Sequence, residues 1–179
     1  MKLYYTRNSY ALLNNNESFG EISPESTSIK YGTKITAVAT EFLGCEFIGW
    51  YNGESMLTKE QQYTFNIECD ITAKFSPHSE ISAFIFETGK DTCIITGIVD
   101  KSVTKIIVPD YVTEIHGGAF SGCSYLQEIT LPFVGNRANV KKTDIIQYPF
   151  GYIFGEKQYT NSTKTEQYYY GPSTNSSVT

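Results

Sequence analysis

Clusters of basic residues are missing from this chain of 179 residues, which carries 14 Lys and Arg against 19 Asp and Glu. The formal net charge is −5, and the densest basic position is the pair Lys141–Lys142. A surface that follows a phosphate backbone needs concentrated positive charge. The composition therefore argues against nucleic acid as a partner.

Long apolar runs are also missing. No window approaches the roughly 20 apolar residues needed to cross a bilayer, and the first residues, Met1–Asn8, contain no apolar core of signal-peptide length. We expect no membrane span in this chain. If the protein is exported, we expect the chain to be an excerpt or a truncated relative of a longer protein, with signal and anchor outside it.

Residues that perform catalysis are scarce. The two histidines, His78 and His116, lie far apart, and no G-x-S-x-G, H-E-x-x-H, P-loop or paired-carboxylate motif occurs. The sequence predicts no catalytic residues, no cofactor and no metal, and a protein that is not an enzyme.

The four cysteines are too far apart in sequence for a zinc site of the C-x₂₋₄-C type. Two disulfides are one option in an exported protein. Four thiols that act as small apolar residues are the preferred alternative. The four are Cys45, Cys69, Cys93 and Cys123.

Aromatic residues, by contrast, make up 15% of the chain, with 14 Tyr and a single Trp. Tyr, Thr, Ile and Val favour strands because their side chains suit a half-buried pleated surface. Long stretches of Ala, Leu, Glu and Lys at helical period are absent. The composition predicts a β-rich protein.

Period-two alternation marks the first module, residues 1–77. It predicts strands at Ile35–Thr40, Tyr63–Ile67 and Ile71–Phe75, and a further strand is expected at Leu3–Tyr10. Asn52–Gly53 is typical of a type I′ hairpin turn, and Glu68–Asp70 is short enough for a hairpin loop.

Phe47 and Trp50 would lie on opposite faces of a regular strand. A bulge at Gly49 would bring both rings into one core. An exposed Trp50 that serves as a ligand platform is the alternative. We prefer packing, because a domain this small needs its only Trp inside.

Four segments of this module, Tyr31–Ala39, Gly44–Tyr51, Tyr63–Phe65 and Asp70–Phe75, resemble the divergent internalin B-repeat family. The resemblance covers Tyr31–Phe75 well and Met1–Lys30 loosely, and Cys45 replaces the family's usual Tyr. It implies a small all-β module, with the β-grasp as one candidate fold, that recurs on bacterial surface proteins and has no catalytic residues.

An internal repeat marks the second module, residues 78–132. Val103, Ile106, Val108 and Pro109 recur 23 residues later as Leu126, Ile129, Leu131 and Pro132. Each unit reads as a short strand ended by proline, which cannot continue the ladder. The intervening apolar residues are expected to point inward: Val112, Ile115, Ala119, Phe120 and Cys123. A period of this length is typical of a leucine-rich repeat.

Two segments, Thr92–Pro109 and Val112–Leu126, resemble the BspA-type leucine-rich repeats of bacterial surface proteins. His116 stands where that family usually has Gly. The resemblance implies a short, incomplete solenoid and places Cys123 in its core. A catalytic pair of Cys123 and His116 is the competing interpretation, and no third orienting group is evident for it.

The outward strand positions of such a solenoid are the candidates for ligand contact. They are Lys105, Ile107, Glu128 and Thr130. The alternative, that they are merely solvated, is at least as good for one complete repeat.

The remaining chain, residues 133–179, is rich in Tyr and resembles, more weakly, an insertion seen between BspA-type repeats. Tyr168, Tyr169 and Tyr170 are weak candidates for contact with glycan or protein. Tyr148–Gly155 is too aromatic for a free linker, and we expect it to pack on the second module. Within it, Pro149–Phe154 is expected to cover Ile129 and Leu131 at the open end of that module.

Together the modules predict a non-catalytic adhesion or recognition module of a secreted or cell-surface bacterial protein. Its ligand would be a host or bacterial surface protein or a glycan, and neither this ligand nor the oligomeric state follows from the sequence. Two alternatives remain: a structural spacer, and an accessory module of an extracellular hydrolase whose catalytic domain lies outside the chain.

Overall fold

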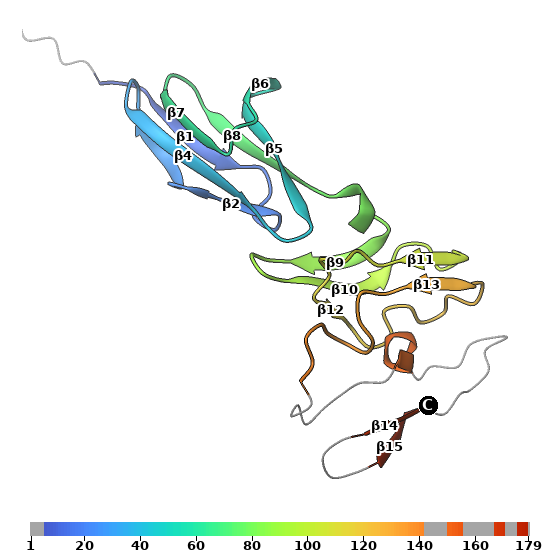
Figure 1. The fold of residues 1–179 in the computed structure, drawn as a ribbon. Coiled ribbons are helices and arrows are strands. Elements are labelled where there is room, and N and C mark those ends of the chain that lie inside the picture. Colours follow the sequence, from blue (N-terminus) through green and yellow to red (C-terminus); the bar gives the residue numbers. More distant parts are fainter. Residues whose placement is uncertain (1–5, 142–149, 156–166, 171–174, 179) are drawn as a thin grey trace, which may run out of the picture. The chain divides into compact units, whose positions relative to one another are not determined.

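The computed structural model describes residues 6–141 and 150–155, together with the backbone of 167–170 and 175–178. The chain divides into two compact units, Met1–His78 and Ser79–Thr179 (Figure 1). The described residues are β-rich, and their two helical segments are short 3₁₀ turns. The prediction of a β-rich protein is therefore confirmed.

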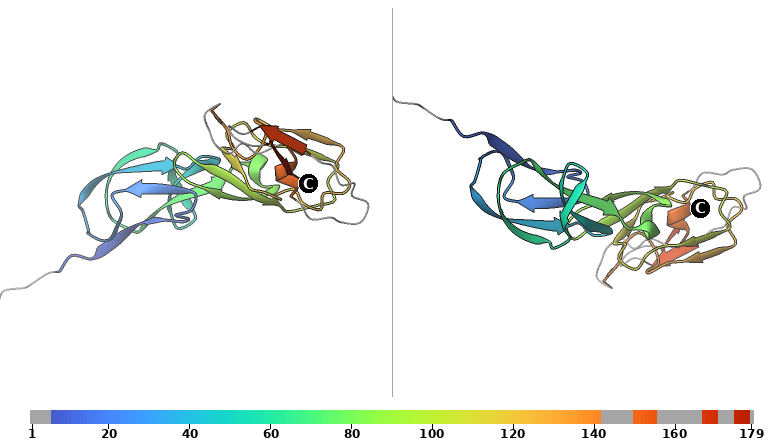
Figure 2. Two further views of the ribbon diagram at one scale, coloured as in Figure 1. Left: turned by 90° about the horizontal axis from the view of Figure 1, so that it is seen from below. Right: turned by 90° about the horizontal axis from the view of Figure 1, so that it is seen from above.

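The described residues of the first unit form eight strands in two sheets. The strands are β1 (Ser9–Asn14), β2 (Gly20–Ser23), β3 (Ser26–Lys30), β4 (Lys34–Glu41), β5 (Cys45–Asn52), β6 (Ser55–Thr58), β7 (Gln62–Asn66) and β8 (Ile71–Pro77). One sheet has the order β3-β1-β8-β5-β6 and the other β2-β4-β7, and Figure 2 shows them from two further directions. All neighbours are antiparallel except the parallel pair β1 and β8.

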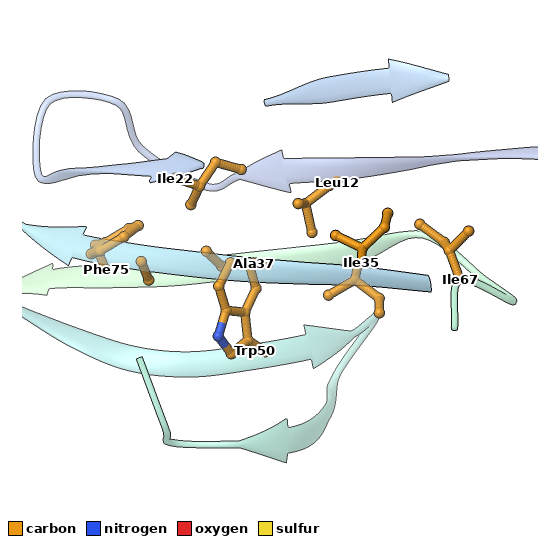
Figure 3. Packing of buried hydrophobic residues seen from close by; sticks show 10 residues of the cluster. Leu12, Ile22, Ile35, Ala37, Trp50, Ile67 and Phe75 are labelled. Atoms are coloured by element: carbon orange, nitrogen blue, oxygen red, sulfur yellow. The ribbon is translucent and has the colours of Figure 1, made fainter. Parts of the chain in front are cut away.

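The core of this unit is built from both sheets (Figure 3). Alternate residues of β4 and β8 point into it, as their period-two pattern predicts. These are Ile35, Ala37 and Ala39 on β4 and Ile71, Ala73 and Phe75 on β8. Leu12 on β1 and Ile22 on β2 complete the contact between the layers.

Trp50 lies in the middle of this core with no exposed surface. The β5–β8 register shifts between Phe47 and Gly49, and Gly49 has a φ of 149°, which favours glycine. The bulge brings the Phe47 and Trp50 rings to 5.6 Å, edge to face. The predicted arrangement of Trp50, Phe47 and Gly49 is confirmed.

Three local predictions for this unit were wrong. Within the expected strand at Leu3–Tyr10, Thr6–Asn8 are not in a strand, and β1 begins at Ser9, where pairing with β3 begins. Leu3–Tyr5 lie outside the described residues. Glu68–Asp70 does not close a hairpin, because β7 and β8 belong to different sheets. The Asp70 carboxylate accepts a hydrogen bond from the backbone N–H of Ala11 at 2.7 Å, which directs the chain toward β1.

The third concerns Asn52–Gly53. A hairpin does form there, with Asn52 opposite Ser55, but the two loop residues are Gly53 and Glu54. Only Gly53 has a positive φ, of 57°. A type I′ turn needs a positive φ at both central residues, so the predicted turn type is wrong.

The second unit consists of η1 (Ser79–Ile81), β9 (Phe84–Thr88), β10 (Cys93–Ile98), β11 (Lys105–Ile107), β12 (Glu114–Ile115), β13 (Glu128–Thr130), η2 (Phe150–Phe154), β14 (Gln167–Tyr170) and β15 (Asn175–Val178). Its small sheets are β12-β10-β9, β11-β13 and the β14-β15 pair. The β10–β12 and β11–β13 pairs are parallel. The predicted inward residues between β11 and β13, Val112, Ile115, Ala119, Phe120 and Cys123, are all buried.

The 3₁₀ turn η2 packs on the turn that precedes Phe120. The backbone N–H groups of Gly118 and Phe120 donate to the carbonyls of Tyr152 and Ile153, both at 2.9 Å. The Phe120 and Phe154 rings lie 6.3 Å apart, and Ile153 is fully buried. The segment Phe150–Phe154 therefore completes this core at the Gly117–Phe120 turn. Contrary to the prediction, these contacts do not cover Ile129 and Leu131. Both side chains are half-buried.

No disulfide joins the four cysteines, all of which lie within the described residues. Cys45, Cys93 and Cys123 are buried, and Cys69 is half-buried. They pack as small apolar side chains, so the preferred alternative to two disulfides is confirmed.

We predict that Trp50→Ala lowers the free energy of unfolding of the first unit by about 3–5 kcal/mol, the usual cost of removing a fully buried indole. Chemical denaturation followed by circular dichroism measures it. The control is Tyr31→Ala, since Tyr31 is 45% exposed, and it should cost about 1 kcal/mol or less. Equal losses in the two variants would contradict the buried position of Trp50.

We predict that Ile153→Ala lowers the stability of the second unit by about 2–5 kcal/mol, because the cavity opens beneath the Gly117–Phe120 turn. Thermal and chemical unfolding of the full chain report the loss. Phe150→Ala, in the same turn but at a side chain that is 38% exposed, should cost less. An unchanged unfolding transition for Ile153→Ala would mean that η2 is an appendage.

Candidate binding surface

The strands β11 and β13 pair in parallel at the spacing of the sequence repeat. Lys105 lies opposite Glu128, Ile106 opposite Ile129, and Ile107 opposite Thr130, each 23 residues apart. The N–H of Val108 donates to the carbonyl of Thr130 at 2.9 Å and extends the ladder. Equivalent positions of the two repeats are thus direct neighbours in space.

Alternation along the two strands separates an inner and an outer face. Ile106 points inward and is 2% exposed. The four outward positions are the four residues that the sequence nominated, Lys105, Ile107, Glu128 and Thr130, and all four are exposed. The structure therefore brings these candidates together on one face, called here the β11–β13 face.

The two charged residues of this face, Lys105 and Glu128, form an ion pair with each other. The Lys105 Nζ lies 2.7 Å from the Glu128 Oε1, with about half of each side chain exposed. An ion pair so exposed contributes about 0–1 kcal/mol, because water screens it. Beside it Ile107 exposes 57% of its surface. The face presents a neutral ion pair next to an aliphatic side chain.

The turn before β11 is held by Asp100. Its carboxylate accepts hydrogen bonds from the backbone N–H and the hydroxyl of Ser102, at 2.8 and 2.7 Å. These two bonds lower the pKa of Asp100 below its ordinary value. The turn fixes where the chain enters β11 and hence where Lys105 stands.

Tyr168, Tyr169 and Tyr170 belong to β14, whose backbone pairs with β15. Their side chains lie outside the described residues, so their candidacy stays a prediction.

The alternative of a catalytic pair, Cys123 and His116, is weakened by the state of the thiol. His116 Nε2 does lie 3.5 Å from the Glu114 carboxylate, which is the orienting group that the sequence did not reveal. Cys123 is 5% exposed, and burial raises the pKa of its thiol, with the nearby Lys101 acting in the opposite direction. A nucleophilic cysteine needs a lowered pKa.

Sequence reasoning missed a hollow of about 610 Å³ in the first unit. It is bordered by Glu41, Glu46 and Glu60, by Lys59, Gln61 and Gln62, by Phe47, and by Cys45 and His78. These residues come from β4, β5, β7, the segment before β7 and the residue that follows β8. Only the tertiary fold assembles them, so no local pattern marks the hollow.

Neither a metal centre nor a membrane helix is found in the part of the chain that the structure describes. No group of three or more His, Cys, Asp or Glu there could hold a metal ion. None of the described helices is long and apolar enough to span a bilayer.

Comparison with known proteins adds no relative: no family model, no curated protein and no solved structure matches the chain.

We predict that Cys123 reacts with a thiol reagent much more slowly than Cys69 in the folded protein, because Cys69 is half-buried and Cys123 is buried. Timed labelling, followed by peptide mass spectrometry, measures both rates in one sample. Urea should bring the two rates together. Rapid labelling of Cys123 without denaturant would restore the reactive-cysteine interpretation.

Proposed function

We propose that this chain is a non-catalytic recognition module that binds its ligand through the β11–β13 face. The single observation that supports the proposal is the in-register pairing of β11 with β13. That pairing places the four outward residues of two successive repeats side by side.

The chemistry of the face suits the docking of another macromolecule. Ile107 is exposed within a regular strand, and burial of an Ile side chain on binding would contribute about 1.5–3 kcal/mol. Lys105 and Glu128 stand beside it and would set register and orientation, since charged groups at the rim of an interface mainly provide specificity.

The cellular location and the ligand class of this module are part of the proposal. The resemblance of the two units to internalin B-repeats and to BspA-type leucine-rich repeats supports a secreted or cell-surface bacterial protein that binds a host or bacterial surface protein or a glycan. Recognition and a spacer differ in ligand binding, which the following prediction tests.

We predict that a triple variant, Lys105→Ala with Ile107→Ser and Glu128→Ala, loses at least about tenfold in affinity for ligands found on an array of purified surface proteins and glycans. All three side chains are exposed and their ion pair is weak, so the variant should unfold at nearly the wild-type temperature. Biolayer interferometry with each array hit measures the affinity.

The control is Ile85→Ser, which removes an equally exposed aliphatic side chain, 56% exposed, from β9. It should bind like the wild type. If the triple variant binds every hit normally, or if the array gives no hit, the β11–β13 face is not the recognition surface and the spacer function is preferred.

A further inference from the structure

The hollow of the first unit lies where three strands and one turn meet. Glu41 ends β4, and Glu46 and Phe47 stand at the start of β5. Lys59–Gln61 precede β7, and Gln62 is its first residue. These positions border one depression of about 610 Å³, which is within the usual size range of a small-molecule site.

Its wall on the side of β7 is held firmly. The indole Nε1 of the buried Trp50 donates to the carbonyl of Glu60 at 3.1 Å. The N–H of Ala39 donates to the carbonyl of Gln61 at 2.9 Å, and the Gln61 amide donates to the Glu41 carboxylate at 2.5 Å. A wall anchored at three points loses little freedom when a ligand arrives, and preorganisation of this kind improves affinity.

The opposite wall is anchored through the bulge of β5. Phe47 contacts Trp50 at 5.6 Å and Phe75 at 5.4 Å between ring centroids, so that its ring is fixed by the core while part of it borders the hollow. The hollow thus combines an immobile ring with polar groups on two sides.

The polar groups include both donors and acceptors. Three carboxylates accept, the Lys59 ammonium donates, and the two glutamine amides do both. Three carboxylates against one ammonium give the lining a net negative charge, which repels an anionic ligand. Hydroxyl groups donate and accept at once and carry no charge, so they suit this lining, while the ring of Phe47 can contact an apolar C–H surface.

We propose that this hollow binds an uncharged saccharide. The ligand's hydroxyl groups bond to Glu46 and Gln62, whose side chains are exposed at its border, and its C–H face lies against Phe47. This site is separate from the β11–β13 face and does not depend on the function proposed for it.

The single tryptophan reports binding directly, because Trp50 holds the Glu60 carbonyl of the wall. The full chain is screened on an array of neutral glycans. Array hits and three reference hexasaccharides, of β-1,4-glucose, α-1,4-glucose and β-1,4-N-acetylglucosamine, are then titrated while Trp50 emission and the heat of binding are followed. At least one neutral saccharide should bind and change the Trp50 emission. Glu46→Ala and Gln62→Ala should each weaken it at least about fivefold.

The matched control is Glu68→Ala, which removes an exposed carboxylate of the same unit outside the hollow and should leave binding unchanged. The triple variant of the β11–β13 face should also bind the saccharide normally, which separates the failure of one proposal from that of the other. The proposal is overturned if no neutral saccharide binds at millimolar concentration. It is also overturned if Glu46→Ala and Gln62→Ala leave the affinity for the saccharide unchanged. It is overturned equally if a Lys-rich peptide, and no saccharide, changes the Trp50 emission.

Discussion

The burial of Trp50 is the constraint on which the first unit depends. A strand of strict alternation cannot direct both Phe47 and Trp50 inward, so the chain inserts a bulge at Gly49, where a side chain would meet the Thr58 carbonyl at 2.8 Å. The indole then fills the space between the sheets and keeps one polar atom, which donates to the Glu60 carbonyl. A buried indole N–H without a partner would cost about 1–3 kcal/mol, so the core and the wall of the hollow are stabilised by the same side chain.

The second unit is built differently, because three of its strands are only two or three residues long. Its parallel pairs bring repeated apolar positions together across long sequence separations, and loops supply much of the core. Phe120 is central, since its ring lies 6.2 Å from Phe84 and 6.3 Å from Phe154. Because its strands are short, this unit relies on such aromatic contacts. Each contributes about 0.5–1.5 kcal/mol beyond the burial of apolar surface area.

The sequence predicts those parts of the fold in which apolar residues recur at a regular spacing. Alternation in Ile35–Ala39 and the 23-residue repeat each identified inward and outward residues, and hence the four residues of the β11–β13 face. The pairing partners of the strands were harder to predict from the sequence. The three residues of Glu68–Asp70 suit a hairpin and a crossover between sheets equally. In the structure β7 pairs with β4, whereas β8 pairs with β1 and β5 in the other sheet. The hollow was beyond prediction, because its lining residues are neighbours only after the two sheets have packed.

The two surfaces also differ in how strongly structure limits their residues. Lys105, Ile107, Glu128 and Thr130 stand on a ladder that their backbones make, so their side chains can change without affecting the core. Phe47 and Glu60 are tied to Trp50 by ring contact and hydrogen bond, so the hollow keeps its shape as long as the core persists. A surface of the first kind can be retuned for a new macromolecular partner by substitution. In the hollow only the wall of Phe47 and Glu60 is tied to stability, while the exposed Glu46 and Gln62 at its border can change without affecting the core.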